Sequence, residues 1–169
     1  MDATRDSEPT PMKNPTTVER KSGRELVTTR TFNAPARIVF EAWTKPELFK
    51  RWWAPKSMGM SLLSCEMDVR VGGRYRLVFG DGLEFFGRYI EVITHSRLVW
   101  TNEEGGDAGP VTTLTFEEKG GKTLLVMHEL YPSKEALDAA GTGAADAMHE
   151  TFEQLDELLV ALGASVGRT

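Results

Sequence analysis

The chain has 169 residues, of which 40% are hydrophobic and 27% are charged, so it predicts one globular domain with a core of normal size. Its net charge of −5 and pI near 5.3 exclude a protein that depends on a basic face to bind nucleic acid. No apolar run is long enough for a membrane span, and the first residues lack the apolar stretch of a signal peptide. With a single cysteine, Cys65, and hence no internal disulfide, the sequence predicts a cytoplasmic protein.

The N-terminal part predicts a tail followed by one strand and two short helices. Residues 1–23 are rich in Thr, Pro, Ser and charge, which is typical of a disordered tail. Residues 25–32 alternate apolar and polar side chains and predict the first strand. Residues 35–44 carry apolar side chains at helical spacing, with a proline in the first turn and Asn33 as the expected N-cap. A second proline then predicts a separate short helix over residues 46–53.

The middle of the chain predicts an antiparallel meander. Short β-like runs alternate with short turns, most of which contain glycine, and such closely spaced strands pair with their neighbours in sequence. The expected strands cover residues 61–69, 74–79, 83–93, 98–102, 111–117 and 123–131.

The C-terminal part predicts helices. A short helix from residue 133 is expected to be interrupted by the glycines of residues 141–143. Apolar residues then recur every three or four positions and predict a long amphipathic helix. This stripe consists of Ala145, Met148, Phe152, Leu155, Leu159 and Leu162. The only predicted partner large enough to cover it is one face of the sheet, and residues 164–169 are expected to form a short tail.

These elements predict a single α+β domain over residues 24–163. Its antiparallel sheet is curved and wraps around the long C-terminal helix, and two short helices follow the first strand. Four segments, residues 43–55, 67–76, 87–101 and 149–159, resemble the START-like (SRPBCC) superfamily. Within it they resemble the family typified by the C-terminal domain of Aha1, the activator of the heat-shock-protein-90 ATPase. The resemblance implies a helix-grip fold with a cavity between sheet and helix.

Large apolar residues near this sheet–helix gap are candidates for the cavity wall. Neighbouring residues of a helix point about 100° apart, so Trp52 and Trp53 cannot both face the core, and one of them is expected at the mouth of the cavity. Ordinary core packing is the alternative interpretation for every candidate. The expected apolar ligand-binding residues are Trp52, Trp53, Phe79, Phe85, Trp100, Met127, Met148 and Phe152.

Two polar residues accompany this set. Glu129 shares the alternation of the apolar residues in the last strand, and His149 lies beside the apolar stripe of the long helix. If both point inward, they can fix the polar end of a ligand or act as an acid–base pair. Exposure of His149 at the flank of the helix is the alternative. Arg70, Arg74 and Arg76 lie around one turn, and they fit either an anion site or a charged surface hairpin.

Neither a metal site nor a cofactor is expected. The three histidines, His95, His128 and His149, lack metal-ligand spacing with each other and with Cys65. The glycines of residues 141–143 begin like a dinucleotide fingerprint, but its third glycine position holds Asp146 and no βαβ unit surrounds it. No nucleophile–base motif is recognisable, so no catalytic residue is assigned.

Three functions remain as hypotheses. The first is binding of a small hydrophobic or aromatic molecule in the cavity. The second is a protein-interaction module with a chaperone or stress-response link, using the acidic face of the long helix or the basic stretch at residues 45–56. The third is a cyclase- or lyase-type enzyme that uses Glu129 and His149. The resemblance adds a homodimer as a hypothesis, because relatives pair.

Overall fold

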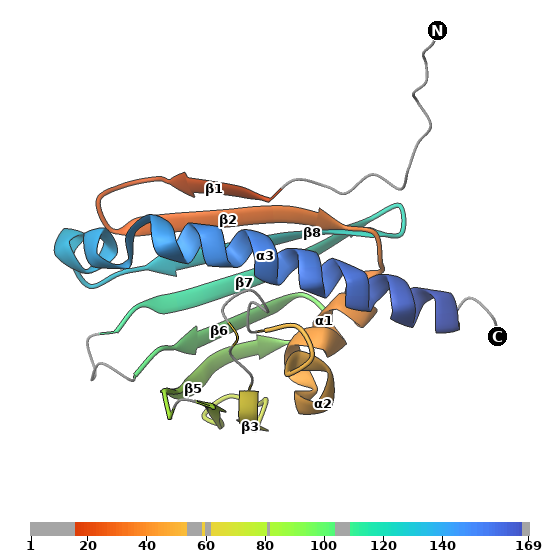
Figure 1. Ribbon diagram of the computed structural model, residues 1–169. Helices are drawn as coiled ribbons and strands as arrows, with labels where there is room; N and C mark the ends of the chain where they lie inside the picture. Colours follow the sequence, from red (N-terminus) through yellow and green to blue (C-terminus); the bar gives the residue numbers. More distant parts are fainter. Residues whose placement is uncertain (1–15, 54–58, 60–61, 81, 104–108, 167–169) are drawn as a thin grey trace, which may run out of the picture.

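The computed structural model describes residues 16–53, 59, 62–80, 82–103 and 109–166, with the backbone alone at 140–147 and 163–166. Eight strands and three helices lie within these ranges (Figure 1). The strands are β1 Thr17–Arg20, β2 Glu25–Phe32, β3 Leu62–Met67, β4 Arg74–Phe79, β5 Glu84–Ile93, β6 Arg97–Thr101, β7 Val111–Lys119 and β8 Lys122–Leu130. The helices are α1 Ala36–Thr44, α2 Pro46–Phe49 and α3 Lys134–Val166.

All eight strands form one antiparallel sheet in the order β1-β2-β8-β7-β6-β5-β4-β3. Strands β3 to β8 follow one another as the predicted meander, and β2 then pairs with β8 from Glu25↔Leu130 to Phe32↔Thr123. Because β2 and β3 lie near opposite edges of the sheet, α1 and α2 connect them across its end, while α3 lies over one face (Figure 1). This confirms the predicted α+β fold of an antiparallel sheet around a long C-terminal helix.

The sheet begins earlier than the sequence predicted. Residues 17–20, assigned to the disordered tail, form β1 and pair with β2 from Thr17↔Thr29 to Arg20↔Leu26. Val18 packs against a small apolar cluster that includes Leu26. An edge strand with one packed apolar side chain has almost no hydrophobic pattern, and so the sequence did not reveal it.

Helix α1 begins at a different cap from the one expected. Pro35 occupies the N-cap position without a side-chain cap, whereas Asn33 lies outside the helix. The Ala36 N–H instead donates a hydrogen bond of 2.8 Å to Glu118 Oε1 from the end of β7. A carboxylate from another element therefore satisfies a free amide of the first turn and interacts favourably with the positive end of the helix dipole. The second helix is shorter than predicted and ends at Phe49.

Helix α3 is continuous, so the predicted interruption at residues 141–143 is wrong. It contains 33 residues, which corresponds to a length of about 50 Å. Each glycine lowers local helix stability by about 1 kcal/mol, but alanines flank the pair and a cooperative helix tolerates such a cost. On this helix Phe152, Leu155 and Leu159 are buried against the sheet, whereas Val160 is 63% exposed.

The main core lies between α3, α1 and the covered face of the sheet. Phe32 on β2 meets Phe152 edge-on, with ring centroids 5.6 Å apart, and Leu114 and Leu125 are fully buried beside them. Arg30 also points inward from β2. Among the described residues, no helix combines the length and apolar character that a membrane crossing requires.

Candidate functional site

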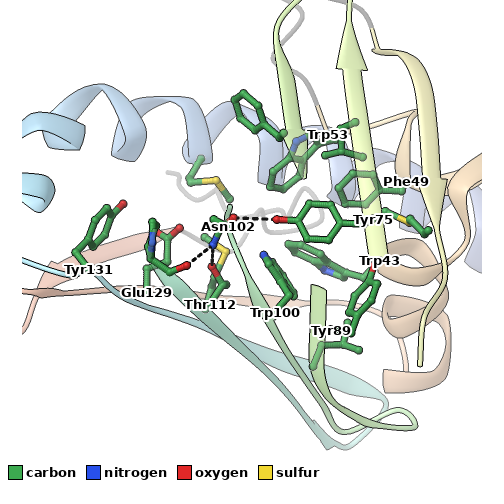
Figure 2. Close-up of a pocket in the computed structure, with 17 residues that line it drawn as sticks. Trp43, Phe49, Trp53, Tyr75, Tyr89, Trp100, Asn102, Thr112, Glu129 and Tyr131 are labelled. Carbon is green, nitrogen blue, oxygen red and sulfur yellow. Dashed lines mark hydrogen bonds between the residues drawn. The ribbon is translucent and has the colours of Figure 1, made fainter. Parts of the chain in front are cut away.

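A cavity of about 400 Å³ lies between the covered face of the sheet, α3 and the end of the molecule that carries α1 and α2. Its wall is mostly aromatic and aliphatic, as the close-up in Figure 2 shows. The aromatic residues that line it are Trp43, Phe49, Trp53, Tyr75, Phe85, Tyr89, Trp100 and Tyr131. Three methionines join them, namely Met67, Met127 and Met148. Aromatic and methionine side chains of this kind suit the recognition of apolar molecules of variable shape.

Sheet register places four of the lining residues in one row across adjacent strands. Tyr89 on β5 pairs with Trp100 on β6, Trp100 pairs with Thr112 on β7, and Thr112 pairs with Glu129 on β8. Paired residues point to the same face, so all four side chains face the cavity. Figure 2 shows Glu129 and Tyr131 at one end of the cavity, away from Trp43, Phe49 and Tyr89. The site therefore has a polar end and an aromatic end.

Three polar groups of the wall bond to each other and to the backbone. The Tyr75 hydroxyl donates to the Thr101 carbonyl at 2.7 Å and lies 3.2 Å from Asn102 Oδ1. The Asn102 amide donates to the Pro110 carbonyl at 2.9 Å and to Thr112 Oγ1 at 3.0 Å. These bonds tie β4, the end of β6 and the start of β7 together, so they have a structural role at the cavity wall.

A glycine makes room for this arrangement. A Cβ atom at Gly87 on β5 would lie 2.0 Å from the Thr101 carbonyl oxygen and 2.9 Å from the Tyr75 ring. Only glycine permits the backbone and the ring to approach so closely. The absence of a side chain at Gly87 thus lets the Tyr75 ring pass close to β5 and place its hydroxyl against the Thr101 carbonyl of β6.

Glu129 differs from the other polar groups of the wall. In the part of the chain that the structure describes, no hydrogen bond or ion pair joins its carboxyl group to another residue. Burial raises the pKa of Glu129 to about 7, although neighbouring His128 opposes the shift. Burial and the Glu129 charge together raise the pKa of Tyr131 to about 12. Burial likewise raises the pKa of Tyr89. At neutral pH the cavity thus contains one carboxyl group close to its midpoint of ionisation and the neutral phenols of Tyr89 and Tyr131.

The two adjacent tryptophans take the different positions that helical geometry demands. Trp52 is fully buried, and its indole N–H donates to the Ala42 carbonyl at 3.0 Å. Trp53 is half-buried and lines the cavity. Trp43 also lines the cavity, and its ring lies 4.8 Å from that of Trp52 and 5.8 Å from that of Trp53. Within the described residues its buried indole N–H has no acceptor.

The structure brings six of the ten predicted ligand-binding residues to the cavity. They are Trp53, Phe85, Trp100, Met127, Glu129 and Met148. The other four do not line it. Trp52 and Phe152 are sealed in the core, and Phe79 is buried with its ring edge-on to Phe85, at 5.4 Å. His149 is exposed, because it lies one residue beyond Met148 and points off the covered side of α3.

Exposure of His149 removes the predicted acid–base pair with Glu129. The other residues considered for reactivity, anion binding or metal binding have ordinary structural explanations. Burial raises the pKa of the Cys65 thiol to about 11, which favours an unreactive thiol. Arg70 and Arg76 pair with Asp68 and Glu84 on the surface, as expected for a charged hairpin. Within the described ranges, no three His, Cys, Asp or Glu side chains gather closely enough to hold a metal ion.

Several cavity residues were missed by the sequence analysis. They are Trp43, Phe49, Met67, Tyr75, Leu77, Tyr89, Leu98, Asn102, Pro110, Thr112 and Tyr131. Strand alternation offered a signal for some of them, since Tyr75 and Leu77 share the inward face of β4 with Phe79. Others, such as Phe49 and Pro110, lie outside the strands that face the cavity and carry no pattern of their own.

Comparison with known proteins places this geometry in a family. A family model described as Activator of Hsp90 ATPase homolog 1-like protein matches residues 33–160. A solved structure from Rhodobacter sphaeroides is similar with a TM-score of 0.78 and 28% identity, covering 87% of this chain and 99% of that one. One from Staphylococcus epidermidis has a TM-score of 0.71 and 28% identity, covering 86% and 94%. Among curated proteins, no sequence gives a significant match.

A further structure, from Nitrosomonas europaea, has a TM-score of 0.75 at 24% identity and covers 86% of this chain and 99% of that one, which shows the shared fold alone. The family match supports a ligand-binding type of domain with a START-like fold. It extends from the residue after β2 through most of α3 and so includes every described residue of the cavity wall. The chain therefore belongs to the family of Activator of Hsp90 ATPase homolog 1-like proteins.

Proposed function

We propose that the protein binds a small, largely apolar and aromatic molecule in the cavity between the sheet and α3. The observation that carries the proposal is a cavity of about 400 Å³ with a mainly aromatic and methionine wall. Pockets for small molecules typically measure about 300–1,000 Å³ and are lined by such side chains, with a few polar groups that fix orientation. Trp53, Trp100 and Met148 supply flat or flexible apolar surface, and Glu129 supplies the polar group.

Native mass spectrometry of the freshly purified protein tests the proposal first, because it detects a retained ligand directly. The second test is calorimetric titration with 1-methylnaphthalene, a flat apolar probe. Met148→Trp adds a large ring at the cavity wall and is expected to weaken probe binding at least about tenfold by filling the volume. Val160→Trp introduces the same side chain at an exposed position of the same helix and serves as the matched control.

The outcomes separate clearly. A ligand or probe that binds the native protein and the Val160→Trp variant, but not the Met148→Trp variant, supports binding in the cavity. Equal affinity for both variants would place the probe elsewhere on the protein. Absence of both a retained ligand and probe binding would remove the proposed function.

The second candidate function is interaction with a protein partner. The family description favours it, because it names an activator of the Hsp90 ATPase. In this chain Lys50 and Arg51 are exposed just after α2, where a protein partner with an acidic surface can reach them. Charge reversal at both residues is expected to abolish capture of such a partner in a pull-down and to leave probe binding unchanged. Equal capture by the native and reversed proteins would exclude this surface.

A further inference from the structure

The side chain of Glu129 breaks the apolar pattern of the covered face. The inward residues of β8 are Thr123, Leu125, Met127 and Glu129, and the first three are buried. A glutamate at the fourth position places a carboxyl group where the alternation calls for an apolar side chain. Such a group opposes folding unless it has a partner, so its place at the cavity indicates a role outside packing.

The described wall of the cavity offers Glu129 no positive partner. Among the described residues that line the cavity, none is a lysine, an arginine or a histidine. Tyr75, Asn102 and Thr112 are engaged with one another or with the backbone. The cavity therefore contains one acidic group and no described basic group to balance it. A carboxylate or phosphate ligand would meet repulsion at this end.

The rest of the wall favours positive charge as well. Trp100 lies two strands from Glu129 in the same cross-strand row, and Tyr131 lies beside Glu129 at the same end of the cavity (Figure 2). Aromatic faces attract organic cations through their quadrupole, most strongly where water is excluded. A carboxyl group combined with aromatic faces is the combination that recognises ammonium and heteroaromatic cations.

We propose that the ligand of the cavity is an organic cation, with its apolar body among the aromatic residues and its positive group at Glu129. This inference rests on the proposed function, since it specifies the chemical class of the ligand bound there. A neutral apolar compound fills the same volume but leaves the Glu129 carboxyl group without a partner. An anionic compound adds repulsion to that loss.

The ionisation of Glu129 couples the binding of such a cation to pH. Because burial raises the pKa of Glu129 to about 7, the carboxylate population grows as the pH rises from 6 to 8. A permanent cation is therefore expected to bind more tightly with rising pH, by up to about tenfold per unit below pH 7. Other titratable groups near Glu129 are His128, which precedes it on β8, Tyr131, which follows β8, and Glu25 on β2, which pairs with Leu130; Tyr89 on β5 lies in the same cross-strand row.

Three probes of similar shape test the inference by calorimetric titration at pH 8. They are 1-methylquinolinium as cation, 1-methylnaphthalene as neutral compound and 1-naphthoate as anion. The native protein is expected to bind the cation about tenfold more tightly than the neutral probe and the anion most weakly. Glu129→Gln keeps the size of the side chain and removes its charge. This variant is expected to lose about tenfold in cation affinity while neutral-probe affinity stays within about twofold.

Glu117→Gln is the matched control, because Glu117 is exposed on the neighbouring strand β7 and loses the same charge outside the cavity. All three affinities are expected to stay unchanged in this variant. If Glu129→Gln fails to fold, the native protein supplies the test, since cation affinity is expected to rise between pH 6 and pH 8 while neutral-probe affinity stays flat.

The outcomes distinguish this inference from the proposed function. A neutral probe that binds as tightly as the cation, or a cation preference that survives Glu129→Gln, would overturn the choice of a cation and leave the cavity as a binding site. If the native protein binds none of the three probes and retains no ligand in native mass spectrometry, both proposals fail.

Discussion

The two ends of the covered sheet face differ in how completely they are packed. We call the first the filled end; it is formed by Phe32, Leu125, Phe152, Leu155 and Leu159, each 2% exposed or less. The second is the hollow end, which is the wall of the 400 Å³ cavity. On α3 the change falls between Met148 and Phe152, and on β8 it falls after Leu125. One helix and one strand thus support a solid core over one stretch and line a cavity over the next.

The two ends also differ in how their inward charged residues are paired. Arg30 at the filled end is 3% exposed, donates to Thr16 Oγ1 at 2.9 Å and pairs with Asp156 at 3.1 Å. Its guanidinium also lies 5.5 Å from the Phe32 ring centroid. Glu129 at the hollow end has no such partner among the described residues. A paired buried charge indicates a structural role, whereas an unpaired one beside a cavity fits the cationic ligand proposed above.

The largest expected effect comes from emptying the filled end. Phe152→Ala removes a ring that packs against Phe32 and Trp43 and leaves a void in a closed core. We expect a loss of about 3–5 kcal/mol in the free energy of unfolding, measured by urea denaturation. Val160→Ala, at a 63% exposed position of the same helix, is the control and is expected to change stability by less than about 0.5 kcal/mol. A loss near 1 kcal/mol for Phe152→Ala would show that the filled end repacks.

Removal of the partner of Arg30 is expected to have the next largest effect. Asp156→Ala leaves a guanidinium that is 2% exposed without its carboxylate, at a cost of about 3 kcal/mol in the free energy of unfolding. Glu153→Ala changes an exposed carboxylate one turn earlier and controls for helix effects. A double variant, Arg30→Met with Asp156→Leu, is expected to recover most of the loss, because both charges are then absent. Equal stability of Asp156→Ala and Glu153→Ala would show that the ion pair between Arg30 and Asp156 has no structural role.

The sequence predicted the fold better than the site, for physical reasons. The apolar stripe that includes Phe152 and the turn signals between strands are local patterns, and they were enough for the sheet and the long helix. Strand β1 was missed because backbone pairing with β2 holds it in place, while Val18 is its one packed apolar side chain and gives almost no hydrophobic pattern. Trp52 and Trp53 illustrate the limit at the site, because spacing predicts that they diverge but not which one faces the cavity.

Glu129 shows what the sequence does carry about the site. Its alternation with Leu125 and Met127 predicted an inward carboxyl group, and the structure places it at the cavity wall. The direction of His149, its supposed partner, depends on which side of α3 faces the sheet. Neighbouring residues of a helix point about 100° apart, so a small error in this rotation moves His149 from the cavity to solvent. Whether Tyr75 and Tyr89 face the cavity depends on the pairing register of β4, β5 and β6. This register shifts near Tyr89, and the sequence does not reveal the shift.

Ionisation of Glu129 is expected to make stability depend on pH. Burial raises its pKa in the folded protein from 4.5 to about 7, so the folded state retains a proton that the unfolded chain has lost in this range. The contribution of Glu129 to stability is therefore complete below pH 4.5 and is lost as the pH rises to about 7, by up to about 3 kcal/mol. Urea denaturation of the native protein and Glu129→Gln across pH 4.5–8 measures it.

Glu129→Gln is expected to gain stability relative to the native protein as the pH rises through this window, with a constant difference above pH 8. Other titratable groups, such as the His128–Glu25 pair at 2.8 Å, are present in both proteins, so the difference isolates Glu129. A flat difference would mean that the carboxyl group is solvated when ionised.

The smallest expected effect comes from enlarging the hollow end. Met148→Ala removes a flexible side chain that already borders empty space and is only partly buried, so few contacts are lost. Alanine also favours a helix slightly more than methionine does. We expect a loss of about 1 kcal/mol or less in the free energy of unfolding, well below that of Phe152→Ala only one turn away. Urea denaturation of both variants in one series checks this, and equal losses would show that the cavity end is as tightly packed as the filled end. A small loss for Met148→Ala combined with weaker probe binding would show that this side chain contacts the ligand rather than supporting the core, because truncation of a core side chain lowers stability by more than this.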